Sequence, residues 1–90
     1  MEKEILTKIP EGERLISEVV WENIDRYRSE KRITVSTLCL KVGYQTSEYI
    51  KNKKSGKQIR LNTIQKFAWA LGVKTLDLFE DWSEQWVTSI

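Results

Sequence analysis

Two short helical patterns, separated by only three residues, restrict the fold of this 90-residue chain more than any other feature. Leu38 and Val42 lie on one face of a helix expected over residues 35–42, and Gly43 can close it in the left-handed conformation. A second short helix is expected over residues 46–54. Helices of this length are marginal alone, so both must pack against each other and against longer neighbours.

Longer apolar patterns on either side supply those neighbours. Apolar residues recur at helical spacing over 13–31 and over 61–71, and Thr75 can begin a short fifth helix. No alternating strand pattern is present, so we expect an all-α fold of five helices in one domain. The chain then divides into an N-terminal arm, a helical domain and a C-terminal tail, at residues 1–12, 13–79 and 80–90.

The expected core is formed by apolar side chains on the inner faces of these helices. They are Ile16, Val20, Ile24 and Tyr27 in the first, Leu38, Cys39 and Val42 in the second, Tyr49 and Ile50 in the third, Leu61, Ile64, Phe67, Ala68 and Leu71 in the fourth, and Leu76, Leu78 and Phe79 in the fifth. Cys39 occupies the position where the two short helices approach closely, which favours a buried small side chain over a reactive thiol.

Residue types that most catalysis requires are missing. With no histidine and one cysteine, the chain lacks Ser-His and Cys-His pairs and the common zinc sites, and it has no glycine-rich phosphate loop. We therefore expect no enzyme, metal or cofactor. No apolar run approaches the roughly 20 residues of a membrane helix and no signal-peptide pattern is present, so we expect a cytoplasmic protein with no membrane partner.

Charge is distributed unevenly along the chain. The overall net charge is +2, but residues 31–74 carry ten basic residues against Glu48 alone, a net charge of +9. Residues 1–30 carry −3 and residues 75–90 carry −4. A basic middle between acidic ends indicates a polyanionic partner.

The same basic stretch contains the two short helices and their glycine turn, which together form a helix-turn-helix pattern. An α-helix fits the major groove of DNA, and residues near its N-terminus reach base edges. Gln45, Thr46, Ser47 and Lys51 could hydrogen-bond there, although Thr46 and Ser47 are also ordinary N-capping residue types. The cations just beyond are suited to phosphates: Lys53, Lys54, Lys57 and Arg60.

Residues 24–79 resemble the lambda repressor/Cro-type (XRE-type) family of DNA-binding domains. The resemblance implies a five-helix fold, double-stranded operator DNA as the partner, and usually a homodimer. The residues that carry it are Ile24-x-x-Tyr27-Arg28-x-x-Lys31-x-Ile33-Thr34, Leu38-Cys39-x-x-Val42-Gly43, Ser55-Gly56-Lys57, and Leu61-x-x-Ile64-x-x-Phe67-Ala68-x-Ala70-Leu71-Gly72-Val73 followed by Leu78-Phe79.

The chain departs from the family in the helix expected to read bases, because the spacing from Gly43 to Gly56 is one residue longer than usual. Two registers follow. In the ungapped register, Tyr49 enters the core, and the family's base-reading positions are Thr46, Ser47 and Lys51. In the other register, Ile50 is the anchor, and the base-reading positions are Ser47, Glu48 and Asn52. We favour the first, because Glu48 would be repelled by phosphates.

The C-terminal tail carries an apolar stripe at helical spacing, formed by Phe79, Trp82, Trp86 and Ile90. An apolar stripe at the end of a small domain must be covered. We expect Trp82, Trp86 and Ile90 to form a dimer interface; the alternative is that both tryptophans fold back onto the domain of their own chain.

These observations together predict a sequence-specific regulator of transcription. The simplest mechanism is repression by promoter occlusion, as in repressors of phages and mobile elements or in antitoxins, with a toxin or an antirepressor as a further protein partner. The alternative is a protein-binding module with the same fold, such as an antirepressor or an anti-CRISPR-type inhibitor.

Overall fold

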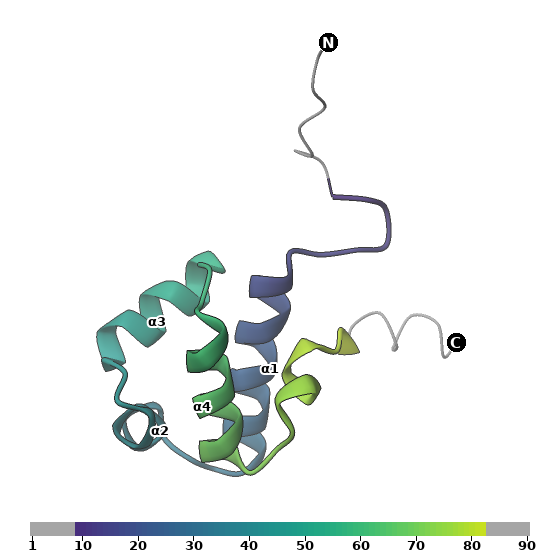
Figure 1. The fold of residues 1–90 in the computed structure, drawn as a ribbon. Helices are drawn as coiled ribbons and strands as arrows, with labels where there is room; N and C mark the ends of the chain where they lie inside the picture. Colours follow the sequence, from purple (N-terminus) through teal and green to yellow (C-terminus); the bar gives the residue numbers. More distant parts are fainter. Residues whose placement is uncertain (1–8, 83–90) are drawn as a thin grey trace.

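The computed structural model describes residues 9–82, and every regular element within that range is helical. Four α-helices are followed by a 3-10 helix, η1 (Figure 1). Their bounds are α1 (Ile16–Glu30), α2 (Val35–Val42), α3 (Thr46–Ser55), α4 (Leu61–Leu71) and η1 (Thr75–Phe79). The expected all-α class is therefore confirmed for the described residues, while the fifth helix is a single 3-10 element in place of an α-helix.

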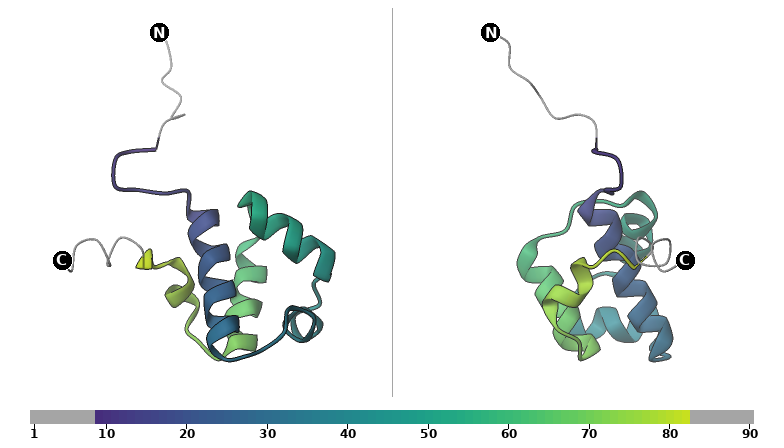
Figure 2. Two further views of the ribbon diagram at one scale, coloured as in Figure 1. Left: turned by 180° about the vertical axis from the view of Figure 1, so that it is seen from behind. Right: turned by 90° about the vertical axis from the view of Figure 1, so that its right-hand side faces the viewer.

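Two helices form the centre of the molecule. α1 and α4 run side by side, with α2 and α3 on one flank and η1 on the other (Figures 1 and 2). α3 contacts α1 and α2, and η1 contacts α1 and α4. This arrangement places α3 at one edge of the molecule, far from η1.

The ends of the short helices follow the expected chemistry. The Thr34 side chain accepts a hydrogen bond from the Thr37 amide at 3.1 Å, which caps the start of α2. Gly43 ends α2 in the left-handed region, at φ +81°. After α1 the C-cap residue is Lys31, and the following residue, Arg32, adopts the left-handed conformation at φ +57°, which costs a residue with a side chain more than it costs glycine.

The core joins α1, α3 and α4 through a group of aromatic side chains. The ring of Trp21 lies edge-on to Tyr49 at 5.3 Å and to Phe67 at 5.9 Å between centroids. Edge-to-face contacts at such distances are favourable beyond the apolar area that they bury. The buried cluster also includes Leu38, Cys39 and Leu78, and it thus connects every element from α1 to η1.

Several expected core positions are exposed instead. Ile16, Leu61 and Leu76 each lie at the first or second position of their element and face solvent. α1 begins at Ile16 and not at residue 13, so Ile16 lies at the exposed end of the helix. Helical spacing identifies a stripe, but it cannot show how far along the stripe the neighbouring elements extend.

Candidate nucleic-acid interface

α3 buries one face and exposes the other, and two consecutive residues show the division. Tyr49 is 0% exposed, whereas Ile50 is 54% exposed. Tyr49 is therefore the core anchor, and the register in which Ile50 takes that role is wrong. The exposed face carries Ser47, Ile50, Lys51 and Lys54, whose spacing of three and four residues places them on one side of the helix.

A carboxylate on α1 fixes the rotation of α3. The Tyr49 hydroxyl donates a hydrogen bond to Oδ1 of Asp25 at 2.8 Å, and Nε of Arg28 donates to the same oxygen at 2.9 Å. Partial burial raises the pKa of Asp25, but the hydrogen bonds from Arg28 and Tyr49 outweigh it and leave that pKa below its usual value. Asp25 is thus a charged acceptor at neutral pH, and it holds the middle of α3 against α1.

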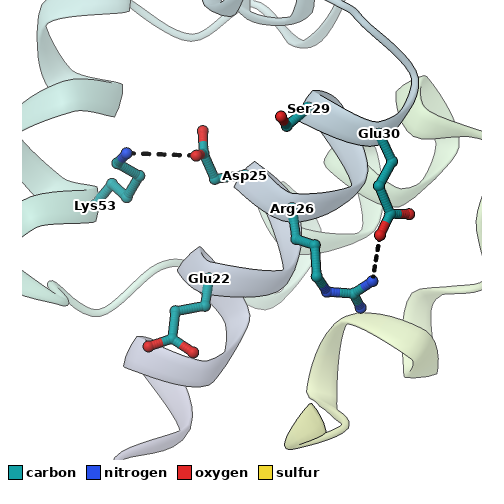
Figure 3. Close-up of a pocket in the computed structure, with 6 residues that line it drawn as sticks. All are labelled: Glu22, Asp25, Arg26, Ser29, Glu30 and Lys53. Atoms are coloured by element: carbon teal, nitrogen blue, oxygen red, sulfur yellow. Dashed lines mark hydrogen bonds and ion pairs between the residues drawn. The ribbon is translucent and has the colours of Figure 1, made fainter. Parts of the chain in front are cut away.

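Lys53 is directed toward α1. Its Nζ lies 3.5 Å from Oδ2 of Asp25, and both residues line a groove of about 560 Å³ (Figure 3). The same view shows Arg26 reaching Glu30 along α1, at 3.0 Å. The expectation that Lys53 neutralises a DNA phosphate stays a prediction: its side chain is 40% exposed, but its ammonium group already has a carboxylate partner on α1.

The C-terminal end of α3 is held by side chains of α1. The Ser17 hydroxyl donates to the carbonyl of Gly56 at 2.7 Å, and Nε1 of Trp21 donates to the carbonyl of Lys57 at 2.9 Å. A Cβ atom at Gly56 would lie 2.6 Å from Cγ of Glu18, and the φ of +66° there also favours glycine. α1 therefore positions both the middle and the end of α3.

Asn52 is part of the inner face of α3. It is only 5% exposed, and its Nδ2 donates to the Tyr44 hydroxyl at 2.9 Å and to Oε1 of Glu48 at 3.4 Å. Its Oδ1 is buried without a hydrogen-bond partner. The expectation that Asn52 reads a base is therefore wrong, because its side chain lies on the buried face of α3.

The start of α3 differs from a conventional cap. The N-cap residue is Gln45, whose side chain makes no capping hydrogen bond, so Thr46 and Ser47 belong to the first turn of the helix. Burial raises the pKa of the Cys39 thiol, and a hydrogen bond with the Thr46 side chain offsets part of that shift. The Thr46 side chain thus interacts with Cys39 on α2, and Gln45, Thr46 and Ser47 are all exposed.

Cations continue the exposed face beyond α3. Lys54, Lys57 and Arg60 are all exposed, and Arg60 directly precedes α4. The first amide groups of a helix lack partners within it and carry partial positive charge.

Lys51 lies 3.7 Å from Glu48, an exposed ion pair of small energetic weight. The surface therefore combines hydrogen-bond donors with net positive charge.

The structure describes only part of the C-terminal stripe. Trp82 is partly buried, and its ring lies 4.9 Å from Cζ of Arg26 on α1 of the same chain. This contact agrees with the alternative in which the tail folds back onto its own domain. Trp86 and Ile90 lie outside the described residues.

Comparison with known proteins identifies the fold but no family. No protein-family model matches the chain, and no curated protein does. The crystal structure of a hypothetical transcription factor, NHTF, from Neisseria is similar, with a TM-score of 0.72 and 21% identity over 94% of this chain and 97% of that chain. None of the helices between residues 9 and 82 is long and apolar enough to cross a membrane. The chain therefore shares its fold with a protein described as a hypothetical transcription factor.

Proposed function

We propose that this chain is a sequence-specific regulator of transcription that binds double-stranded DNA through α3. The observation that carries the proposal is the division of that helix. Buried contacts from α1 and α2 fix its inner face, and the outer face presents Ser47, Lys51 and Lys54 to solvent. A rigid helix with exposed donors and cations is the form that enters a major groove.

The finer assignment is to the lambda repressor/Cro type. We propose that the exposed residues at the start and middle of α3 contact base edges: Gln45, Thr46, Ser47 and Lys51. The cations that follow contact phosphates: Lys54, Lys57 and Arg60. Two copies would place their α3 helices about 34 Å apart, one turn of DNA, and read a palindromic site. Binding over a promoter would repress it by occlusion.

Sedimentation with and without DNA tests the dimer, and a monomer under both conditions would contradict it.

The test of DNA binding is selection of sites from random duplexes, followed by affinity measurements at several salt concentrations. If each of two copies neutralises about three phosphates, the slope of log K against log salt is about −5. Lys57→Gln should make the slope shallower by roughly one unit per copy, whereas Lys74→Gln, at the start of η1, should leave it unchanged. Failure to select any duplex would overturn the proposal.

A second function deserves a test because of exposed apolar side chains away from α3. Trp69 on α4 is 64% exposed, and Leu76 on η1 is 77% exposed. Tryptophan is prominent among the residues that dominate protein–protein affinity. A protein-binding module would bind its target with little salt dependence, and Trp69→Ala would weaken that binding. A DNA-binding protein would show a strong salt dependence, and Trp69→Ala would leave its affinity for DNA unchanged.

A further inference from the structure

Ile50 is the apolar residue on an otherwise polar face of α3. It is 54% exposed, and the residues that share its side of the helix are Ser47, Lys51 and Lys54. Exposed isoleucines are unremarkable when scattered singly on a surface. Ile50, however, lies between Ser47, which can donate a hydrogen bond, and two lysines, Lys51 and Lys54, which would contact a polyanion.

Contacts in the middle and at the end of α3 fix the position of Ile50. The preceding residue, Tyr49, is fully buried and bonded to Asp25, and the carbonyl of Gly56 at the end of the helix is bonded to Ser17. Because a β-branched side chain in a helix has one strongly preferred rotamer, Ile50 presents its methyl groups in a defined direction. Ile50 would therefore contact only a partner group placed in that direction.

The flanking charges decide what kind of surface fits Ile50. An apolar protein surface would have to desolvate the ammonium groups of Lys51 and Lys54, which is unfavourable. A DNA groove offers phosphates to those groups, and its floor exposes one kind of apolar group, the 5-methyl of thymine. Apolar side chains contact this methyl group in the major groove, where it distinguishes a T·A pair from the other pairs.

We infer, on the basis of the proposed function, that Ile50 is a specificity-determining residue that contacts the 5-methyl group of a thymine in the target site. The contact adds discrimination that the hydrogen-bonding side chains cannot supply, because it requires neither a donor nor an acceptor. It also accounts for an isoleucine at a position where a polar residue would be better solvated.

The test uses the duplex selected by the wild-type chain, with its thymines replaced one at a time by deoxyuracil. This change removes one methyl group and keeps every base-pairing and hydrogen-bonding atom. We expect the affinity to fall about threefold to fivefold at one position, as for loss of roughly one methyl contact. Ile50→Ala should weaken binding to the thymine duplex by a similar factor and should show no further loss on the deoxyuracil duplex.

Two further variants serve as controls. Ile50→Val, which retains a branched apolar side chain, should keep most of the deoxyuracil penalty. Leu76→Ala, which shortens an exposed apolar residue on the opposite flank of the molecule, should keep all of it. A penalty that persists unchanged in Ile50→Ala, or the absence of a sensitive thymine from a site that the chain binds tightly, would overturn the inference while leaving DNA binding intact. Failure to bind any duplex would instead overturn the proposed function.

Discussion

The two faces of α3 differ in what holds them. On the inner face, Tyr49 and Asn52 are engaged by side chains from α1 and from the turn after α2. On the outer face, Ser47, Ile50 and Lys51 are exposed, and the ion pair from Lys51 to Glu48 stays within the helix. The inner face therefore sets the direction in which the helix points, and the outer face is left available for a partner.

This division implies that stability and binding depend on different residues of one ten-residue helix. Substitutions on the inner face should change the free energy of unfolding. Substitutions on the outer face should change affinity with little effect on folding.

The strongest contrast is between the consecutive residues Tyr49 and Ile50. Tyr49→Ala removes a fully buried ring that packs on Trp21 and should lower the free energy of unfolding by about 3–5 kcal/mol. Ile50→Ala should lower it by less than about 0.5 kcal/mol, as at other exposed sites. Urea denaturation followed by circular dichroism measures both values. Equal losses would show that α3 is rotated differently about its axis.

A smaller effect should appear when only the Tyr49 hydroxyl is removed. Tyr49→Phe deletes a hydrogen bond to the charged carboxylate of Asp25, which should cost about 1.5–3 kcal/mol at neutral pH. The pKa of Asp25 is lowered by folding, so its contribution is present above the unfolded pKa of about 3.9 and is lost as pH falls through the folded value.

The difference in unfolding free energy between wild type and Tyr49→Phe should therefore shrink from pH 7 to pH 3. Urea midpoints at pH 7, 5 and 3 measure it, and Ile50→Ala is the control whose small difference from wild type should not change with pH. A Tyr49→Phe difference that is the same at every pH would mean that Asp25 is not the acceptor.

The smallest expected effect is a gain. Asn52 has a buried Oδ1 without a partner, and an apolar side chain of similar size removes that unmet requirement. The two acceptors that Asn52 would leave, on Tyr44 and Glu48, belong to partly exposed side chains and can bond to water instead. Asn52→Leu should raise the free energy of unfolding by about 1 kcal/mol and leave DNA affinity unchanged. A folded Asn52→Leu variant that binds DNA more weakly would place Asn52 at the DNA, against its burial.

Local sequence patterns predicted much of the fold. The bounds of α2 and α4 agree with their expected ranges, because a capping threonine and two glycines mark their ends. The same patterns did not show that Leu76 is exposed or that η1 is a 3-10 helix. Those features depend on how closely α1 and α4 approach η1, which no short stretch of sequence encodes.

The site was predicted less completely, because its positioning contacts join distant segments. Asp25 and Tyr49 are 24 residues apart, and Ser17 and Gly56 are 39 apart. The spacing of Asp25 and Arg28 suggests a local ion pair. No sequence pattern indicates that Asp25 also accepts a hydrogen bond from Tyr49 and pairs with Lys53. For the same reason the sequence does not indicate that Lys53 pairs with Asp25 on α1.

The central claim is that the outer face of α3 meets DNA, and paired lysine substitutions test it most directly. Lys51→Ala and Lys74→Ala each remove one exposed positive charge, the first from α3 and the second from the start of η1. Affinity for the selected duplex should fall by about 1–3 kcal/mol with Lys51→Ala and by less than about 0.3 kcal/mol with Lys74→Ala, with little change on random DNA. Equal losses from the two variants, or no loss from either, would contradict the assignment of α3 as the DNA-reading helix.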